Sequence, residues 1–301
     1  MKKFIKIMVI VLALVISANA FAACAEEKNI LVISREDGSG TRDAFDGLVK
    51  SSSGATLKKD AAGNSYTESP FVETALFLSK TGDVITKVNQ TKTAIGYISL
   101  GSLNDTVKAL TVEGVEATAA NVTNGSYKLW RPFVIVTNKS VSLTAATADF
   151  ISYLQSTQAQ TIVAENKYVN VTATAAYTAP AQAISGVIVV RGSTSVDPLM
   201  AELIADYLSI GGAKVSGIDF QVDAQGSSHG IAAAKEDTTG NVIGMSSSAI
   251  KSADAEVLNQ FDIAKDAVAI VVNNANSISN ITVQQLFDIY TGEITKFSQL
   301  G

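Results

Sequence analysis

The sequence has very few of the side chains from which most metal centres and hydrolytic sites are made. Its 301 residues include one histidine, His229, and one cysteine, Cys24. These two cannot assemble a zinc site of three or four nitrogen and sulfur ligands, and one cysteine cannot form a disulfide within the chain. A Ser-His-Asp hydrolase would depend on His229 alone. We therefore expect neither a metal nor a bound cofactor.

Positive charge is also scarce. The chain has 23 Lys and Arg residues against 28 Asp and Glu residues, a net charge of −5. No basic run interrupts this acidic balance, so the sequence does not favour binding to nucleic acid or to an anionic membrane surface. The hydrophobic content of 47% is enough for one large core or two ordinary ones. We expect a folded, acidic protein.

The N-terminal segment, residues 1–23, has the pattern of a signal peptide. Lysines precede the apolar run Ile7–Ile16, which is too short to span a bilayer, and small residues follow it. The segment Phe21–Cys24 is similar to the lipobox of bacterial lipoproteins, in which the cysteine is acylated. We expect a lipoprotein on the extracytoplasmic face of the membrane, held only by a lipid on Cys24. If Cys24 is not acylated, the protein would be periplasmic or secreted.

Strand-like and helix-like segments alternate along the rest of the chain, which predicts an α/β architecture. Residues 171–185 are rich in Ala and Thr and read as a linker. We expect strands at Ile30–Ser34, Ile95–Ser99, Val107–Val112, Trp130–Thr137, Val187–Val190, Ile218–Val222, Ile243–Met245 and Val268–Val272, and helices at Thr41–Lys50, 71–79, 82–89, Thr147–Glu165, Pro198–Leu208, Ile231–Lys235 and Val283–Tyr290.

Three expected strand-to-helix turns are built from Gly, Ser and Thr: Asp37–Thr41, Gly192–Ser195 and Gly226–Ser228. The first turn of a helix presents backbone N–H groups without internal partners and a partial positive charge. Such a turn can bind an oxyanion. Ordinary helix capping also explains each turn taken alone, because Ser and Thr are common N-cap residues.

Arg35 directly precedes the first of these turns and strengthens the case for an anion site. Its planar guanidinium suits a bidentate contact with a tetrahedral oxyanion. Asp37, two residues further on, is placed to orient that guanidinium or to accept a hydrogen bond from a protonated ligand. The loop lacks the Lys-Ser/Thr ending of a phosphate-binding P-loop and the acidic spacing of an EF-hand.

Several motifs together resemble the phosphate-binding proteins that feed phosphate ABC transporters. This resemblance implies a two-lobe periplasmic-binding-protein fold of type II, with lobes joined by crossover strands and a ligand cleft between them. The similar segments are Ser34–Phe45, Gly192–Val196, Gly226–Ile231, Ile243–Ser248, Ala94–Leu103 and Phe287–Gly301.

The same resemblance implies that both lobes contribute ligand-binding residues. Ser248 departs from the pattern, because relatives often carry Arg there. His229 stands where the family usually has a small residue, and we interpret it as a residue on the rim. The expected ligand-binding residues are Arg35, Asp37, Ser39, Gly40, Thr41, Thr194, Ser195, Ser227, Ser228 and Ser247.

The order of the two halves differs from the family pattern. In the family, the segment similar to residues 186–301 comes first and the segment similar to residues 29–170 follows. Here the order is reversed, as in a circular permutation, and residues 171–185 would join the family's usual termini. Folds tolerate permutation when the original termini lie close together on the surface.

An intact permutation predicts how the lobes are assembled. One lobe would comprise residues 28–129 plus 275–301, and the other residues 130–274, with the C-terminus beside the start of the strand at Ile30. We expect a monomer, with a domain-swapped dimer as the alternative.

The leading interpretation of function is a solute-binding protein without a catalytic step, which captures inorganic phosphate and delivers it to the permease of an ABC transporter. One alternative is a surface, adhesion or sensor protein that keeps the fold without a role in transport. A second is a phosphohydrolase with Ser39 or Thr41 as nucleophile, which would need a general base close by. Two roles stay open for Asp37: it selects protonated phosphate over sulfate, or it only holds Arg35 in place.

Overall fold

The computed structural model describes residues 28–300, and most of its strands belong to one continuous sheet. The strand order in this sheet is β2-β1-β3-β10-β6-β9-β7-β8, with β4 also paired to β10, while β5 and β11 form a separate pair. The strands are β1 (Leu31–Arg35), β2 (Leu76–Leu78), β3 (Ala94–Ser99), β4 (Val107–Ala109), β5 (Thr111–Val112), β6 (Trp130–Asn138), β7 (Ser185–Gly192), β8 (Gly217–Ala224), β9 (Val242–Ser246), β10 (Leu258–Asn273) and β11 (Asn280–Ile281).

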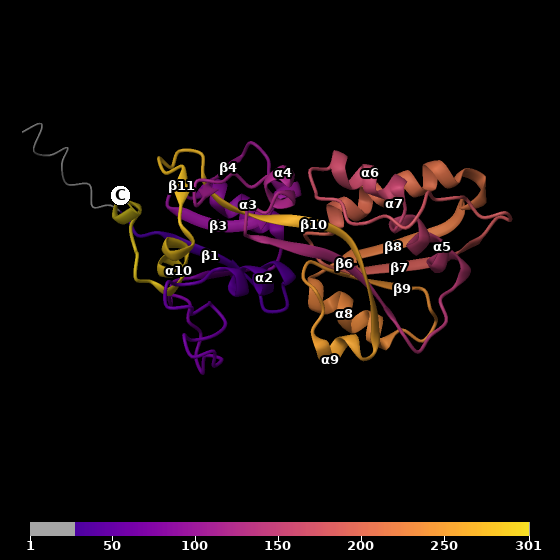
Figure 1. Ribbon diagram of the computed structural model, residues 1–301, viewed down its shortest axis with the longest axis horizontal. Helices are drawn as coiled ribbons and strands as arrows, with labels where there is room; N and C mark the ends of the chain where they lie inside the picture. The colour runs from indigo at the N-terminus through magenta and orange to yellow at the C-terminus, as the bar shows by residue number, and fades with distance from the viewer. Residues whose placement is uncertain (1–27, 301) are drawn as a thin grey trace, which may run out of the picture.

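Helices flank both parts of the sheet, and Figure 1 shows the resulting two lobes side by side. The first lobe contains β1, β3, α2, α3 and α10; the second contains β7, β8, β9 and α5 to α8. The helices are α2 (Gly40–Leu48), α3 (Thr81–Gln90), α4 (Ala119–Thr123), α5 (Ala145–Leu154), α6 (Thr157–Glu165), α7 (Asp197–Gly211), α8 (Ser227–Glu236), α9 (Ser252–Ala255) and α10 (Val283–Thr291).

Two long antiparallel strands, β6 and β10, connect the lobes (Figure 1). Each lobe has its own hydrophobic core, and β10 contributes to both: Ile263 and Ala264 pack in the second lobe, whereas Ala267–Val272 pack in the first. We expected the second lobe to end at residue 274 and the first lobe to resume at residue 275. The two cores instead place this boundary inside β10, between Ala264 and Ala267. The two-lobe α/β fold itself agrees with the expectation.

The C-terminal part of the chain packs in the first lobe, next to the start of β1. The Ile30 N–H donates to the Thr295 carbonyl at 2.7 Å. Residues 171–185 lie against α5 and α6 of the second lobe: Val171 N–H bonds to Gln160, and the Tyr177 hydroxyl donates to Asp149 Oδ2 at 2.7 Å. Gly301, Cys24 and the expected signal peptide lie outside the described residues.

Two of the expected helices differ in the structure. The segment 71–79 contains the short strand β2, which pairs in parallel with β1; tertiary pairing here outweighs the local helical pattern. The expected helix Thr147–Glu165 is instead two helices, since Ser156 begins a new one by accepting a hydrogen bond from the Ala159 N–H. Within residues 28–300, no helix combines the length and apolar character needed to cross a bilayer.

Candidate functional site

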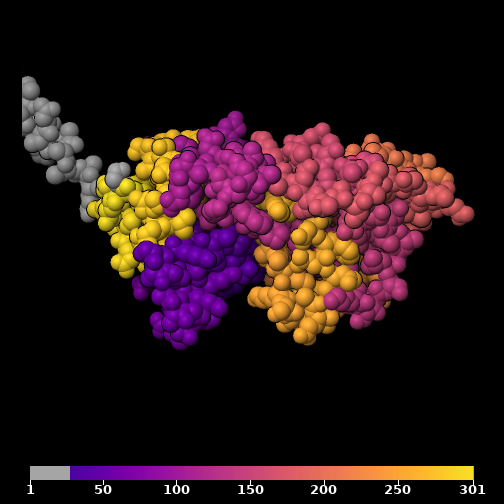
Figure 2. All heavy atoms as spheres, viewed as in Figure 1, coloured from indigo at the N-terminus to yellow at the C-terminus, as the bar shows by residue number. Residues whose placement is uncertain are grey.

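Loops from the two lobes meet in the cleft between them. In the first lobe, the loop after β1 leads into α2. In the second lobe, loops leave the carboxyl ends of β7 and β9, and another joins β8 to α8. Ligands of α/β sheets bind outside the carboxyl ends of strands, as these loops are placed to do. Figure 2 shows the surface hollowed between indigo residues of the first lobe and orange residues of the second.

Arg35, the last residue of β1, lies at the bottom of this cleft with only 2% of its surface exposed. Its Nε and Nη2 donate to the two carboxylate oxygens of Glu36, at 2.9 and 3.0 Å, and to backbone carbonyls at and just after the end of β2. Nη1 donates to Thr81 and Nη2 to Thr194, both at 3.2 Å. One edge of the guanidinium therefore faces a carboxylate, and the other faces hydroxyl groups.

The hydroxyl groups near Arg35 form a largely buried cluster that bridges the lobes. Thr41 Oγ1 lies 2.9 Å from Ser195 Oγ, and Thr81 Oγ1 lies 3.1 Å from the same atom. Thr81 and Thr194 are 3.4 Å apart. Thr41 and Thr81 belong to the first lobe, and the other two residues belong to the second. Because a hydroxyl can either donate or accept, this cluster can turn its donors toward a bound oxyanion.

The start of α2 also contacts the start of α8 across the cleft. The Gly40 N–H donates to Ser227 Oγ at 3.2 Å, and the Ser247 N–H donates to the same oxygen at 3.1 Å. The Ser228 N–H donates to the Gly38 carbonyl at 3.0 Å. The positive ends of two helices from different lobes thus converge beside Arg35.

The expected ligand-binding residues all lie in these loops or at the strand and helix ends beside them. Ser39 caps α2, since its hydroxyl accepts a hydrogen bond from the backbone of α2. The residues that the structure places together are Arg35, Ser39, Gly40, Thr41, Thr194, Ser195, Ser227, Ser228 and Ser247.

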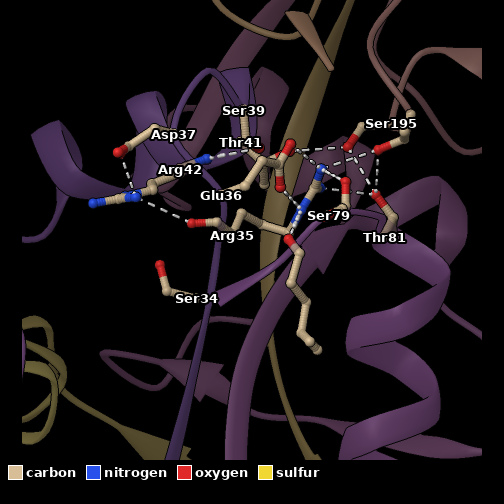
Figure 3. Close-up of polar contacts among 12 residues, drawn as sticks. Ser34, Arg35, Glu36, Asp37, Ser39, Thr41, Arg42, Ser79, Thr81 and Ser195 are labelled. Carbon is tan, nitrogen blue, oxygen red and sulfur yellow. Dashed lines mark hydrogen bonds and ion pairs between the residues drawn. The ribbon is translucent and has the colours of Figure 1, made fainter. Parts of the chain in front are cut away.

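Asp37 lies in the same loop and lines the cavity between the lobes, but its side chain does not bond to Arg35. Its side chain is 96% exposed, and its Oδ1 accepts a hydrogen bond from Arg42 Nη1 at 2.5 Å. Figure 3 shows Asp37 beside Arg42, apart from the groups that surround the Arg35 guanidinium. The next residue, Gly38, has a φ of +89°, and Asp37 lies at the outside of this tight turn. The expectation that Asp37 orients Arg35 is wrong in this structure, because Glu36 holds that position.

The sequence reasoning missed two residues of the cluster, Glu36 and Thr81. Glu36 is adjacent to Arg35, and nothing in the sequence distinguishes it from Asp37 as a partner for the guanidinium. Thr81 lies 46 positions after Arg35, at the start of α3. The segment Ser79–Gly82 has the Ser, Thr and Gly content of the other helix starts, so the same pattern could have identified it.

Aromatic side chains of the first core support Arg35 from below. The Tyr97 hydroxyl lies 2.8 Å from Ser34 Oγ and accepts a hydrogen bond from the Arg35 N–H at 3.3 Å. The ring of Tyr97 stacks on Phe45 of α2, with centroids 3.9 Å apart. Burial raises the pKa of Tyr97 far above its ordinary value, so the hydroxyl stays protonated at neutral pH. This packing fixes β1 against α2 and thereby the position of the arginine.

Outside the Arg35 cluster, the cleft opens into a cavity of about 640 Å³ that is lined by both lobes. Ser248 lies on its wall, where the family pattern often has arginine. Asp46 of α2 also lines it and is buried, with only its Oδ2 bonded, to Arg42 Nε at 3.3 Å. Burial raises the pKa of Asp46 to about 7.

His229 lies on α8 at the edge of this region. Its side chain is 36% exposed, and Nε2 is 3.5 Å from Asp223 Oδ2. Within residues 28–300, no group of three His, Cys, Asp or Glu side chains is arranged to hold a metal ion. The hydroxyl groups of Ser39 and Thr41 contact the backbone of α2 and Ser195, respectively.

Comparison with known proteins gives matches along nearly the whole chain. A family model described as the PBP superfamily domain matches residues 15–158 and 174–301. The phosphate-binding protein PstS 2 of Streptococcus pneumoniae is 38% identical over 290 residues, which cover 95% of this chain and 94% of that protein. PstS 2 of Streptococcus agalactiae is 34% identical over 308 residues and covers both chains completely.

A solved structure is also similar over most of its length. It is the phosphate-binding protein of a phosphate ABC transporter from Streptococcus pneumoniae TIGR4, with a TM-score of 0.67 and 37% sequence identity. The match covers 91% of this chain and 100% of that one.

Proposed function

The chain belongs to the PBP superfamily and, within it, to the PstS phosphate-binding proteins, and from this premise we propose that it captures inorganic phosphate for an ABC transporter. It is a solute-binding protein of the extracytoplasmic space, and phosphate is its ligand. Its partner is the membrane permease of that transporter, to which the loaded protein delivers phosphate.

The observation that supports a phosphate site most directly is the set of donors around Arg35. A buried guanidinium, hydroxyl groups and two helix starts converge there from both lobes. A tetrahedral oxyanion needs several donors in a small, dry volume, and charge-assisted hydrogen bonds from arginine are the strongest of these. We assign the ligand contacts to Arg35, Thr41, Thr194, Ser195 and the backbone at Gly40.

The role of Arg35 can be tested by calorimetric titration of phosphate into the parent protein and into Arg35→Ala. Removal of one partner from a buried charged contact costs roughly 2–5 kcal/mol, so the affinity should fall at least about thirtyfold. Arg191→Ala is a matched control, because Arg191 is 35% exposed and pairs with Asp223. An affinity of Arg35→Ala within twofold of the parent would refute the assignment, and a parent without phosphate binding would refute the function.

A binding role without catalysis also fits the environment of the proposed hydrolase nucleophiles. Ser39 is engaged as the cap of α2 and Thr41 as a partner of Ser195. A phosphohydrolase would need a general base within hydrogen-bond distance of one of these hydroxyls. Incubation of the purified protein with a chromogenic phosphomonoester should release no product above the rate of a boiled control.

We also propose that Cys24 is acylated and anchors the protein to the membrane. The support is the similarity of Phe21–Cys24 to a lipobox, together with the position of the chain's single cysteine at the end of the signal-like segment. In cells, the parent protein should fractionate with membranes and incorporate labelled palmitate. Cys24→Ala should lose the label and appear in the soluble extracytoplasmic fraction.

A further inference from the structure

The cavity between the lobes has room for more than an inorganic phosphate ion. Its volume of about 640 Å³ is in the range of sites that enclose small organic ligands. It adjoins the anion donors, because Ser39, Gly40, Ser227 and Ser228 line it and also belong to the two converging helix starts. A phosphate group held by these donors can therefore carry a substituent that extends into the cavity.

Asp46 is the one deeply buried acid among the residues that line this cavity, with 6% of its surface exposed. Its Oδ2 accepts a hydrogen bond from Arg42 Nε at 3.3 Å, whereas its Oδ1 has no partner within residues 28–300. A buried acceptor without a donor is unfavourable, so a ligand that supplies a donor there gains affinity. Because burial raises the pKa of Asp46 to about 7, this carboxyl group can release its proton when a cation binds beside it.

The other charged side chains of the cavity wall largely balance one another. Three acid–base pairs lie on it: Asp37 with Arg42, Asp43 with Lys58, and Asp254 with Lys235. Glu236 and Lys251 are exposed and opposite in charge. Asp46 has only a share of Arg42, so the wall holds one more acid than bases. This charge balance favours a cationic group in the cavity over a second anion.

The second lobe supplies an apolar surface to the same cavity. Its apolar lining residues, from α8 and the segment after β9, are Ile231, Ala232, Ala249 and Ile250. Such a surface suits a methylene chain, which gains by leaving water. Gly40 and Asp46 are about 9 Å apart along α2, since a helix rises about 1.5 Å per residue. The cavity thus combines an anion site, an apolar wall and a buried acid within the length of a small molecule.

Building on the proposed phosphate-binding function, we propose that this cavity is a second subsite, through which the protein also binds phosphomonoesters of short amino alcohols. The phosphate group occupies the Arg35 cluster, the alkyl chain lies along the apolar wall, and the ammonium group donates to Asp46 Oδ1. The ammonium gains a charge-assisted hydrogen bond that the same ester without an amine cannot make.

The test compares two ligands that differ only in the amine, 3-aminopropyl phosphate and propyl phosphate, by calorimetric titration. The parent should bind the amino ester at least about tenfold more tightly, because of its charge-assisted bond. In Asp46→Asn this preference should fall to within about twofold, while the affinity for inorganic phosphate stays within about threefold of the parent. The same titration with two-carbon and four-carbon esters identifies the chain length that best reaches Asp46.

Asp43→Asn is the matched control, since Asp43 lines the same cavity but is half-exposed and paired with Lys58. It should keep the preference for the amino ester. Glycerophosphoethanolamine, a diester, distinguishes a lipid headgroup from a free monoester; it should bind at least about tenfold more weakly than 2-aminoethyl phosphate, because its second substituent displaces donors from the phosphate oxygens.

Equal affinity of the parent for the two propyl esters would overturn the proposal, and this comparison needs no variant to fold. A preference that persists in folded Asp46→Asn, or that is lost equally in Asp43→Asn, would also overturn it. A parent that binds inorganic phosphate but neither ester refutes the second subsite and leaves the proposed function intact. A parent that binds the amino ester but no inorganic phosphate refutes the proposed function instead.

Discussion

Arg131 and Asp266 form an ion pair that is buried where β6 and β10 pass between the lobes. Arg131 Nη2 lies 3.0 Å from Asp266 Oδ2, and the side chains are 1% and 0% exposed. The two residues are direct cross-strand partners. Asp266 Oδ1 also accepts hydrogen bonds from the Ser99 hydroxyl and the Leu100 N–H. One carboxylate therefore joins the connecting strands to the end of β3 in the first lobe.

Asp266→Asn should destabilise the protein by about 3–5 kcal/mol, because it leaves the buried Arg131 charge without its counterion. Chemical unfolding of the parent and the variant measures this difference. The control is Asp43→Asn, which breaks the half-exposed pair between Asp43 and Lys58 and should cost no more than about 1 kcal/mol. Equal losses in the two variants would contradict the proposed importance of the buried pair.

Buried acids should make the protein less stable as the pH rises. Burial raises the pKa of Asp46 to about 7 from 3.8, so the folded state holds a proton that the unfolded state has already released. This contribution is fully present below about pH 4 and is lost as the pH rises through 7. At about 1.4 kcal/mol for each pKa unit, the full effect is of the order of 4 kcal/mol. Burial raises the pKa of Asp266 to about 6, which acts in the same direction.

Unfolding by urea in phosphate-free buffer at pH 5 and pH 8 tests this prediction. The free energy of unfolding should be lower at pH 8 in the parent, and the difference should shrink in Asp46→Asn, which has no proton to lose. Asp83→Asn replaces an exposed acid of α3 and should keep the pH dependence of the parent. The same pH dependence in Asp46→Asn as in the parent would contradict the assignment to Asp46.

The anion loops could be predicted from sequence because their signals are local. A buried apolar run that ends in Arg35 and is followed by Gly-Ser-Gly-Thr indicates a strand, a turn and a helix start, and the structure has each of them. The same holds for the turn at Gly192–Ser195 after β7. Short-range patterns of this kind specify which backbone groups face the cleft.

The parts that could not be predicted depend on contacts distant in sequence or on the direction of a single turn. Thr81 reaches Arg35 only because β2 pairs with β1 and carries the start of α3 to the cleft. Whether Glu36 or Asp37 faces Arg35 depends on how the chain turns after β1, and in the structure this turn leaves Asp37 exposed beside Arg42. Residue types alone do not contain this information.

Gly40→Ala should prevent the lobes from closing on a ligand. A Cβ at this position would lie 2.5 Å from Ser227 Oγ and 2.7 Å from Ser247 Oγ, both in the opposite lobe. We expect phosphate affinity to fall about tenfold or more, which is ~1.4 kcal/mol, and small-angle scattering to show a more open molecule. Gly47→Ala in the same helix is the control, since its Cβ would meet only the end of the Lys58 side chain at 3.8 Å.

The folded chain of Gly40→Ala should melt close to the parent temperature, because the clash lies between lobes and spares both cores. An unaltered phosphate affinity in this variant would show that the lobes do not approach as closely around the ligand as in the structure. A loss of the same size in Gly47→Ala would instead point to a general weakening of α2.

The last prediction concerns the order of the halves. The Ile30 N–H bonds to the Thr295 carbonyl, so the C-terminal segment lies against the start of β1 in the same lobe. We therefore expect a re-ordered chain to fold. It would begin at residue 181, continue through residue 300, cross a short glycine linker to residue 28 and end at Pro180. It should bind phosphate within about threefold of the parent, since no residue of the cleft is changed. Opening the chain between the half-buried Pro180 and the exposed Ala181 should cost little, because most contacts of residues 171–185 precede this point.

Sedimentation at micromolar concentration distinguishes a monomeric permutant from exchanged halves. If each chain closes on itself, the parent and the re-ordered protein both sediment as monomers, because the contacts between β1, β3 and β10 and those of α10 with the first core are made within one molecule. A domain-swapped dimer would make the same contacts between chains and dissociate on dilution only slowly. A re-ordered protein that fails to fold, while the parent is a stable monomer, would contradict the view that residues 171–185 join the original termini of the fold. The physical reason for expecting success is that the strand pairing and the two cores depend on proximity in space, and the re-ordering leaves every such contact in place.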